Sequence, residues 1–260
     1  MSIDLKWQEL STEELLRECS SKSSRVEFWV EFIRRAGIGK MVEVGVFEGD
    51  FASVVLRRCP GIETYYMLDP WRHLPNWNKP ANQEDDVFNR LYESAKRKTD
   101  FAADRRVVLR GMTTEVIDEI PDASLDFAYV DGDHTLKGIT IDLIRVYAKV
   151  SAGGFIGGDD FTPTIWQHSS RYEPTLVYPF AVYFAEAAGA TIYALPNCQF
   201  CIEKSTTAVF KFVDLTGRYT ERSLQHQLSP ERVLKLWARE KFPTMAGLVG
   251  KIRNSMVRAK

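Results

Sequence analysis

The chain has 260 residues, of which 45% are hydrophobic and 27% are charged, and its formal net charge is -1 at pH 7. This length suits one large α/β domain or a domain with additions, and the small net charge argues against nucleic acid as a partner. The polar first residues and the lack of an apolar run long enough to cross a bilayer predict a cytoplasmic protein.

Four cysteines are scattered along the chain, which is too few for a disulfide scaffold. Cys198 and Cys201 form a lone C-x-x-C pair, without the second pair that a structural zinc site needs. We therefore expect thiols packed near a strand turn rather than a metal or redox centre.

The first elements that the sequence predicts are two helices. Ser11 and Glu14 form a capping box at the start of one helix. Residues 23–37 place apolar side chains such as Trp29 on one face of a second helix, which Gly37 ends. Residues 1–37 are therefore expected to form a helical cap on a core that spans residues 38–213.

From residue 40 onward, short apolar runs typical of strands alternate with helical patterns. The predicted strands are residues 40–45, 63–69, 106–111, 125–131, 153–160, 190–195 and 206–214, and the predicted helices are residues 47–59, 83–98, 113–120, 135–150 and 179–189. This alternation predicts an α/β fold with a doubly wound, mostly parallel, seven-stranded sheet. The last two strands have no room for a helix between them, so the last strand should be antiparallel.

The composition changes from Asp214 onward, where ten Lys or Arg stand against four Asp or Glu. Residues 228–242 and 244–260 both have helical patterns, so residues 214–260 are predicted to form a basic helical extension. Two interpretations are open. The extension packs on the domain or on a second subunit, as in the homo-oligomer that we expect, or it is an interfacial helix that touches a membrane or a partner.

Polar side chains follow two apolar strands at the point where each strand ends. Asp131, Asp133 and His134 come after one strand, and Asp159 and Asp160 end the next. Because doubly wound sheets bind ligands at the carboxyl ends of their strands, this edge is the candidate site. A structural role is also open for these residues, since Asp133 is in place to cap the helix that follows it.

The turn after the first strand carries Gly45 and Gly49, with Glu43 at the strand end. Glycines let a backbone approach a ligand closely, but this spacing differs from the G-x-G-x-x-G cradle of dinucleotide enzymes. Glu43 and Glu48 would repel a pyrophosphate, so a cationic ligand with an amino group or a sulfonium suits the turn better.

Two further strand ends offer contacts to a nucleoside. Asp69 ends the second strand, where an acid commonly accepts both hydroxyls of an adenosine ribose. Gly111 and Met112 follow the third strand and are in place to line an adenine face.

These segments resemble, in order and spacing, the successive motifs of class I S-adenosylmethionine-dependent methyltransferases. The resemblance runs from about Met41 to Val213, and the segments that carry it are "VEVGVFEGDFA", "YYMLDPW", "VVLRGMTTEV", "LDFAYVDGDH" and "SAGGFIGGDDF". The closer likeness is to the metal-dependent sugar O-methyltransferases of natural-product pathways, such as the macrocin and mycinamicin enzymes. Residues 1–213 would then form a methyltransferase domain, and residues 214–260 lie outside the resemblance.

The resemblance implies an O-methyltransferase that modifies a hydroxyl of a sugar or glycoside, a small-molecule or glycan acceptor. It implies that S-adenosyl-L-methionine is bound by residues at the strand ends, namely Glu43, Gly45, Phe47, Gly49, Asp69, Gly111, Met112 and Asp131. It also implies that Asp131, Asp159 and Asp160 hold Mg²⁺ or another divalent cation, and that His134 is the catalytic base.

The chemistry needs such groups, because a sugar hydroxyl is a poor nucleophile at neutral pH. A base within hydrogen-bond reach and a Lewis acid both help to remove its proton, and Mg²⁺ prefers hard oxygen ligands. The sequence leaves open whether Asp133 is a metal ligand or lies behind the ligands. It also leaves open whether Trp71, Trp77 and Trp166 stack on a sugar or fill the core.

Other functions compete with this interpretation. Asp131 and Asp133 also form the D-x-D of a metal-dependent nucleotide-sugar glycosyltransferase, although the preceding motifs stand in methyltransferase order. A metal-independent methyltransferase with a non-sugar acceptor is open, as is a non-catalytic protein that keeps donor binding. The glycine spacing disfavours a nicotinamide oxidoreductase.

Overall fold

The structure is a computed structural model, which describes residues 10–169, 171–204, 207–219 and 230–241. The chain divides into two compact units, Met1–Thr220 and Glu221–Lys260. The predicted boundary between a domain and an extension at residue 214 stays a prediction. The last strand, β8, ends at Asp214, and the first unit continues to Thr220.

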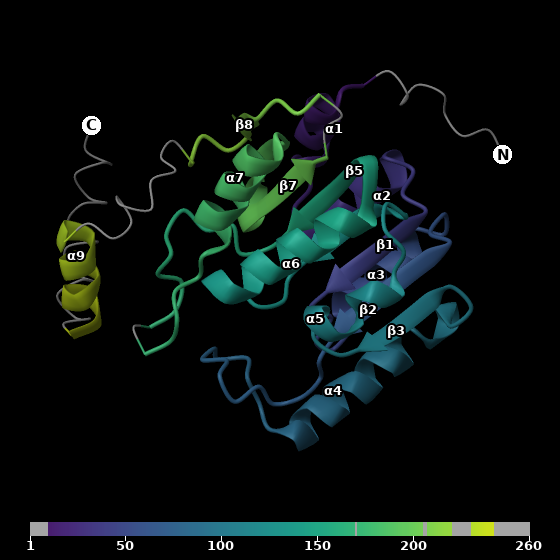
Figure 1. Cartoon of the computed structure of the whole chain (residues 1–260), viewed down its shortest axis with the longest axis horizontal. Coiled ribbons are helices and arrows are strands. Elements are labelled where there is room, and N and C mark those ends of the chain that lie inside the picture. The colour runs from purple at the N-terminus through teal and green to yellow at the C-terminus, as the bar shows by residue number, and fades with distance from the viewer. Residues whose placement is uncertain (1–9, 170, 205–206, 220–229, 242–260) are drawn as a thin grey trace. The chain divides into compact units, whose positions relative to one another are not determined.

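The first unit is built on one eight-stranded sheet (Figure 1). Its strands are β1 (Lys40–Val44), β2 (Thr64–Asp69), β3 (Arg106–Arg110), β4 (Leu125–Val130), β5 (Val150–Gly158), β6 (Thr191–Leu195), β7 (Gln199–Glu203) and β8 (Lys211–Asp214). Its α-helices are α1 (Thr12–Cys19), α2 (Arg25–Arg35), α3 (Asp50–Arg58), α4 (Asp85–Lys98), α5 (Thr113–Val116), α6 (Leu136–Lys149) and α7 (Val177–Ala188). Short 3₁₀ turns complete it, namely η2 (Asp100–Ala102), η3 (Ile117–Glu119) and η4 (Pro196–Cys198).

The strand order β3-β2-β1-β4-β5-β7-β6-β8 confirms the doubly wound, mostly parallel fold. Strands β1 to β5 run parallel, whereas β7 is antiparallel to both β5 and β6. The sheet has one strand more than the sequence predicts, because η4 turns the chain back sharply and Gln199–Glu203 forms a strand that the apolar pattern does not reveal. The segment predicted as the antiparallel last strand instead supplies β8, which lies parallel to β6.

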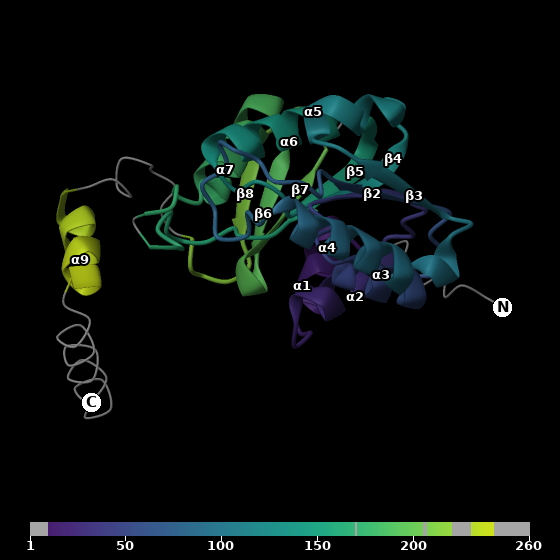
Figure 2. The same cartoon turned by 90° about the horizontal axis from the view of Figure 1, so that it is seen from below.

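Two layers of helices enclose the sheet (Figure 2). Helices α1 to α4 cover one face, and α5 to α7 cover the other. The central strands are therefore buried on both faces, which explains why β1 and β4 are nearly continuous apolar runs instead of alternating ones.

The helical cap packs on the sheet through aromatic side chains. The capping box of Ser11 and Glu14 is present at the start of α1. On α2, Trp29 is fully buried, and its ring centroid lies 5.2 Å from that of Phe127 and 5.6 Å from that of Tyr129. This packing fixes α2 across β4, so its first residue, Arg25, lies near the carboxyl end of that strand.

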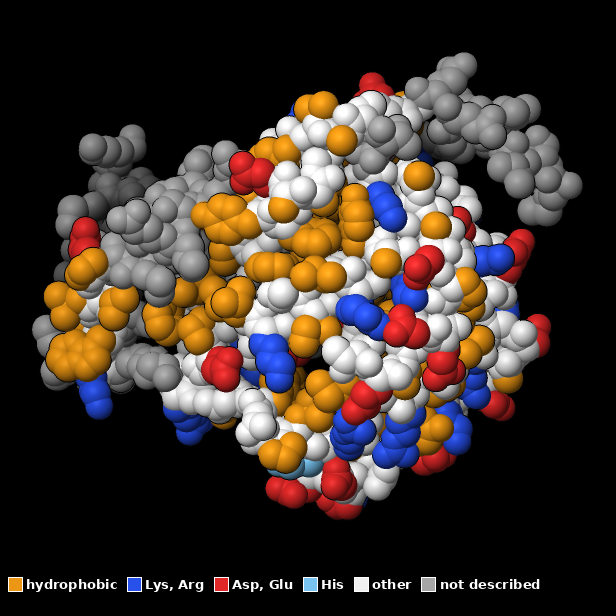
Figure 3. Space-filling view, viewed as in Figure 1, with side chains coloured by type: hydrophobic (Ala, Val, Ile, Leu, Met, Phe, Trp, Pro, Cys, Tyr) orange, Lys and Arg blue, Asp and Glu red, His pale blue; other side chains and the backbone are white. Residues whose placement is uncertain are grey.

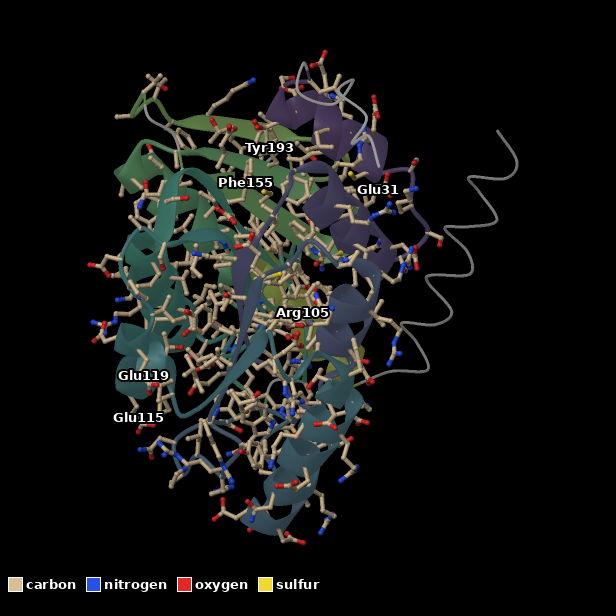
Figure 4. All side chains as sticks on the ribbon, turned by 90° about the vertical axis from the view of Figure 1, so that its right-hand side faces the viewer. Glu31, Arg105, Glu115, Glu119, Phe155 and Tyr193 are labelled. Carbon is tan, nitrogen blue, oxygen red and sulfur yellow. The ribbon has the colours of Figure 1, made fainter. Side chains whose placement is uncertain are left out.

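The core on the α2 side of the sheet extends beyond β4 to β5 and β6. Figure 4 shows Phe155 and Tyr193 on the sheet and Glu31 on the neighbouring helix α2. Phe155 and Tyr193 pack in the same core cluster as Trp29 and Phe32. The apolar contacts of the cap thus extend from β4 across to β6.

The described part of the second unit is one helix, α9 (Pro230–Lys241), within the helix predicted for residues 228–242. Its side chains Val233, Leu234 and Trp237 are exposed. The helix predicted for residues 244–260 lies outside the described residues, and the proposed membrane, partner and oligomer contacts stay predictions. None of the described helices combines the length and the apolarity that crossing a bilayer requires.

Packing at the sheet makes Gly157 a sensitive position. A Cβ atom on Gly157 would lie 2.4 Å from the Trp29 ring and 2.8 Å from the Phe127 ring, whereas one on Gly61 would meet no atom within 4 Å. We expect Gly157→Ala to lower the free energy of unfolding by about 1–3 kcal/mol through overpacking, with Gly61→Ala as the neutral control. Urea unfolding measures both, and equal stability of the two variants would contradict this packing.

Candidate active site

The turn after β1 needs both of its glycines. Gly45 has φ +91°, and a Cβ atom there would lie 2.2 Å from the carbonyl oxygen of Asp131. Gly49 has φ +82°, precedes the first residue of α3, and lies so close to α4 that a Cβ atom would be 2.7 Å from Cα of Ala95. The glycines therefore bring the turn against the β4 loop on one side and against α4 on the other.

Asp69 ties this turn to the loop after β2. Its carboxylate accepts the backbone N–H of Phe47 at 2.8 Å and that of Trp71 at 2.7 Å. The Trp71 indole in turn donates to the carbonyl of Phe47 at 2.6 Å. Trp71 is fully buried, so it fills the core and is not a platform for a sugar, whereas Phe47 is 46% exposed at the turn. Burial raises the pKa of Asp69, and the backbone N–H groups oppose that rise.

The other residues predicted to bind the donor lie around this turn. Glu43 is buried within β1, accepts the Tyr65 hydroxyl at 2.7 Å, and has its pKa raised by burial. Gly111 follows β3 and donates to the carbonyl of Asp69 at 3.0 Å. Met112 donates its N–H to Glu115 at 2.9 Å. The carboxyl ends of β1, β2 and β3 thus meet at one edge. The side chain of Glu43, however, is buried and bonded to Tyr65.

The acidic groups that end β4 and β5 also come together. In the register of these two strands Val130 pairs with Gly158, so Asp131 and Asp159 follow at adjacent strand ends. His134 lies between the two strand ends, with Nδ1 2.5 Å from Asp160 Oδ2 and Nε2 3.4 Å from Asp131 Oδ1. The structure therefore assembles the four residues that the sequence singles out, and their chemical roles stay predictions.

Arg25 joins this cluster from the helical cap. Its Nη1 lies 2.9 Å from Asp131 Oδ2 and also contacts Asp159 Oδ2. The guanidinium thus bridges two carboxylates from neighbouring strands. Sequence reasoning missed this residue because 106 positions separate Arg25 from Asp131, and no local pattern connects them.

Gln199 is the second residue that the sequence analysis missed. Its buried amide donates to Asp159 Oδ1 and accepts the Trp29 indole at 2.8 Å and the Tyr129 hydroxyl at 2.9 Å. Asp159 Oδ1 also accepts the N–H of Asp160 at 2.7 Å. These bonds leave Asp159 Oδ2 as the oxygen that faces Arg25.

His134 is positively charged in this arrangement. Burial alone would lower its pKa, but the hydrogen bonds and negative charges of Asp131 and Asp160 outweigh burial and raise the pKa to about 9. Burial would raise the pKa of Asp160, yet its bond to His134 lowers it. Two cations, Arg25 and His134, therefore compensate the three carboxylates of the cluster.

Asp133 has a structural partner set of its own. It accepts the N–H of Thr135 at 2.9 Å and the indole N–H of Trp77 at 2.9 Å. Thr135, not Asp133, caps α6, because the Thr135 hydroxyl accepts the N–H of Gly138. Asp133 therefore orients the cap and the Trp77 ring.

The loops after β2 and β5 are joined to each other. The ammonium of Lys79, which is buried, donates to the carbonyls of Glu173 at 2.9 Å and Pro174 at 3.2 Å. Asn78 donates to the carbonyl of Arg171 at 2.8 Å. From the second loop, Gln167 donates to Asp160 at 2.6 Å. Both loops are thus linked to the acidic cluster, one through Trp77 and Asp133 and the other through Gln167.

A separate apolar groove lies between α6 and α7, where hydrophobic side chains gather on the surface (Figure 3). It is lined by Ile144, Tyr147, Phe180, Tyr183, Phe184, Ala187 and Ala188. The residues that line it carry no carboxylate, imidazole or thiol.

All four cysteines are free thiols. The chemically equipped site is therefore the edge formed by the strand ends.

Comparison with known proteins agrees with this fold. Residues 42–161 match the model of a family described as a methyltransferase domain. A protein from Staphylococcus aureus assigned as a caffeoyl-CoA O-methyltransferase is similar in structure, with a TM-score of 0.54, 14% identity, and coverage of 77% of this chain and 96% of that chain. An O-methyltransferase from Bacillus cereus in complex with S-adenosylhomocysteine is similar with a TM-score of 0.50, 15% identity, and coverage of 78% and 93%.

At these identities the two solved structures show the fold alone. A search of curated proteins found no match. The family match covers the segment that contains the glycine turn, the strand ends and the acidic cluster. Residues 42–161 thus match a methyltransferase domain, which bears out the prediction that the chain is a methyltransferase enzyme.

Proposed function

We propose that this protein is an S-adenosyl-L-methionine-dependent O-methyltransferase that uses Mg²⁺ or another divalent cation and methylates a hydroxyl of a sugar or glycoside. One observation carries the proposal. Asp131, Asp159, Asp160 and His134 converge at the ends of β4 and β5, and the β4 loop touches the glycine turn of β1. The proposed base and the proposed cation-binding carboxylates therefore lie beside the proposed donor turn.

The donor is proposed to bind at the ends of β1, β2, β3 and β4. Its contacts are the residues that the sequence singles out, namely Glu43, Gly45, Phe47, Gly49, Asp69, Gly111, Met112 and Asp131. The carboxylates of Asp69 and Asp131 at these strand ends favour a ligand with a sulfonium and an amino group over a pyrophosphate. The similar structure from Bacillus cereus holds S-adenosylhomocysteine, which supports the same donor class here.

The carboxylates fit a divalent cation in their chemistry. Among the residues that the structure describes, no three His, Cys, Asp or Glu side chains are arranged around one metal position. Asp131 Oδ2 and Asp159 Oδ2 nevertheless both contact one cationic group, the Arg25 guanidinium, which stands in for an ion. Mg²⁺ is commonly held by one or two carboxylates together with waters and substrate oxygens, so Asp131 and Asp159 would hold it, with Asp160 beside them.

When bound, the metal would act as a Lewis acid that lowers the pKa of the acceptor hydroxyl. The chain itself supplies the proton acceptor. Asp160 holds Nδ1 of His134, whereas Nε2 is buried and has only the longer contact with Asp131 Oδ1, at 3.4 Å. Nε2 is therefore the atom that takes the proton as the acceptor oxygen bonds to the methyl carbon and the carbon–sulfur bond breaks.

The acceptor is proposed to lie between the joined loops. Trp77 is held by Asp133 in one loop, and Trp166 lies half-buried in the other. Indole faces suit the apolar faces of sugar rings, which supports a sugar acceptor.

One alternative has an observation of its own. Because Arg25 already compensates Asp131 and Asp159, a metal-independent methyltransferase would need no further cation. The glycosyltransferase alternative loses support, since both oxygens of Asp133 accept hydrogen bonds from Thr135.

The first prediction concerns the donor. We expect S-adenosylhomocysteine to bind the purified protein with a micromolar Kd in calorimetric titration, about -8 kcal/mol. Gly45→Ala should weaken binding at least tenfold, because its Cβ would lie 2.2 Å from the Asp131 carbonyl and its backbone has φ +91°. Gly61→Ala is the control. Unchanged affinity of Gly45→Ala would remove the donor from this turn.

The second prediction concerns the base. His134→Ala should keep donor binding and lower kcat by about 10²–10⁴-fold, the usual contribution of a general base. Near-wild-type turnover of the variant would remove His134 from the reaction.

The third prediction concerns pH. Because neutral His134 accepts the proton and its contacts with Asp131 and Asp160 raise its pKa, kcat/KM should rise with pH through the imidazole pKa and level off above it, and a metal that engages these carboxylates should move the rise to lower pH. The pH profile of kcat/KM tests this, with His134→Ala as the control that lacks the slope. A profile that is flat from pH 7 to pH 9 in the wild-type protein would show that the imidazole is already neutral.

A further inference from the structure

We propose that the guanidinium of Arg25 and a divalent cation are alternative occupants of the same seat between Asp131 and Asp159. The inference deepens the proposed function and rests on its metal dependence. It assigns to α2 a role in the reaction: Arg25 holds the carboxylate pair together while the metal is absent and withdraws when it binds.

The geometry of the two carboxylates defines the seat. Asp131 offers Oδ2 to Arg25 and turns Oδ1 toward His134. Asp159 offers Oδ2 to the same guanidinium nitrogen, while Gln199 and the N–H of Asp160 occupy its Oδ1. Each residue thus presents one oxygen, from a different strand, to a single point.

Electrostatics requires a cation at this point and allows only one. Two carboxylates this close repel each other unless a positive charge lies between them, and Arg25 supplies it. A divalent cation bound by the same oxygens would place charges of like sign a few ångströms apart, which is unfavourable even at the effective dielectric of a protein surface. Occupation by the metal therefore requires the guanidinium to leave.

Arg25 can leave without moving the helix that carries it. It is the first residue of α2, and its side chain is 38% exposed. One turn further along, Trp29 is fully buried against Phe127 and bonded to Gln199. The helix is therefore fixed by its second turn, and rotation of one long side chain toward solvent is enough to open the seat.

The test measures metal binding directly. Free Mn²⁺ is quantified by electron paramagnetic resonance during titration of the purified full-length protein, in the wild type and in Arg25→Met. Removal of the competing charge is expected to tighten Mn²⁺ binding at least tenfold. Arg25→Lys, which keeps the charge but loses the forked geometry, should lie between the two.

Arg58→Met is the matched control, since Arg58 also pairs with an acid of α2, Glu27, but lies in α3 and away from the seat. It should bind Mn²⁺ as the wild type does. In an Asp159→Asn background, Arg25→Met should no longer change the affinity for Mn²⁺. Circular dichroism and S-adenosylhomocysteine titration on every variant show that the fold and the donor site are intact.

Equal or weaker Mn²⁺ binding by Arg25→Met would overturn the proposal, because Arg25 would then be a neighbour of the metal or irrelevant to it. Absence of Mn²⁺ binding in both proteins would also overturn it and would make Arg25 the permanent cation of a metal-independent enzyme. In that case intact S-adenosylhomocysteine binding would preserve the methyltransferase function, whereas loss of donor binding in the wild type would refute the proposed function itself.

Discussion

Three carboxylates meet at the ends of β4 and β5, and their mutual repulsion must be compensated by positive charge. The parallel pairing of these two strands makes this proximity unavoidable, because the register that pairs Val130 with Gly158 places Asp131 and Asp159 side by side. Arg25 from the helical cap and His134 from the β4 loop supply the compensation. The cluster thereby binds the cap, the sheet and the β5 loop to one another.

The rest of the site is arranged around this cluster. Gly45 lets the glycine turn after β1 lie against the backbone of Asp131, so this turn and the acidic cluster lie in direct contact. Asp69 then fixes the far side of the turn through the N–H groups of Phe47 and Trp71. A ligand bound at the turn would have its reactive end beside the carboxylates, which is the geometry that a transfer reaction needs.

Much of the site could be predicted from the sequence, because it depends on strand ends. An apolar run followed by acids identifies the end of a strand, and parallel strands end at the same edge of a sheet. The convergence of Asp131, His134, Asp159 and Asp160 at one edge is therefore predictable from the sequence, whereas their chemical roles stay predictions. Arg25 and Gln199 could not be found in this way, since their partners come from other elements: Arg25 pairs with a residue 106 positions away and Gln199 with one 40 positions away. The strand that carries Gln199 was itself missed, because the positive φ angles of Asn197 and Cys198 reverse the chain within η4. Trp71 follows a strand in a loop-like sequence, but its side chain packs in the core, with its N–H bonded to Asp69 and its indole bonded to the Phe47 carbonyl.

The donor and the cation are proposed to share the edge formed by β1 and β4. A crystal structure of the protein grown with S-adenosylhomocysteine and Mn²⁺, with anomalous data at the manganese edge, tests it most directly. We predict a manganese peak between Asp131 and Asp159, Arg25 turned toward solvent, and the homocysteine sulfur beside the Gly45–Gly49 turn. A donor bound elsewhere, or no manganese peak with Arg25 still between the two carboxylates, would contradict the claim.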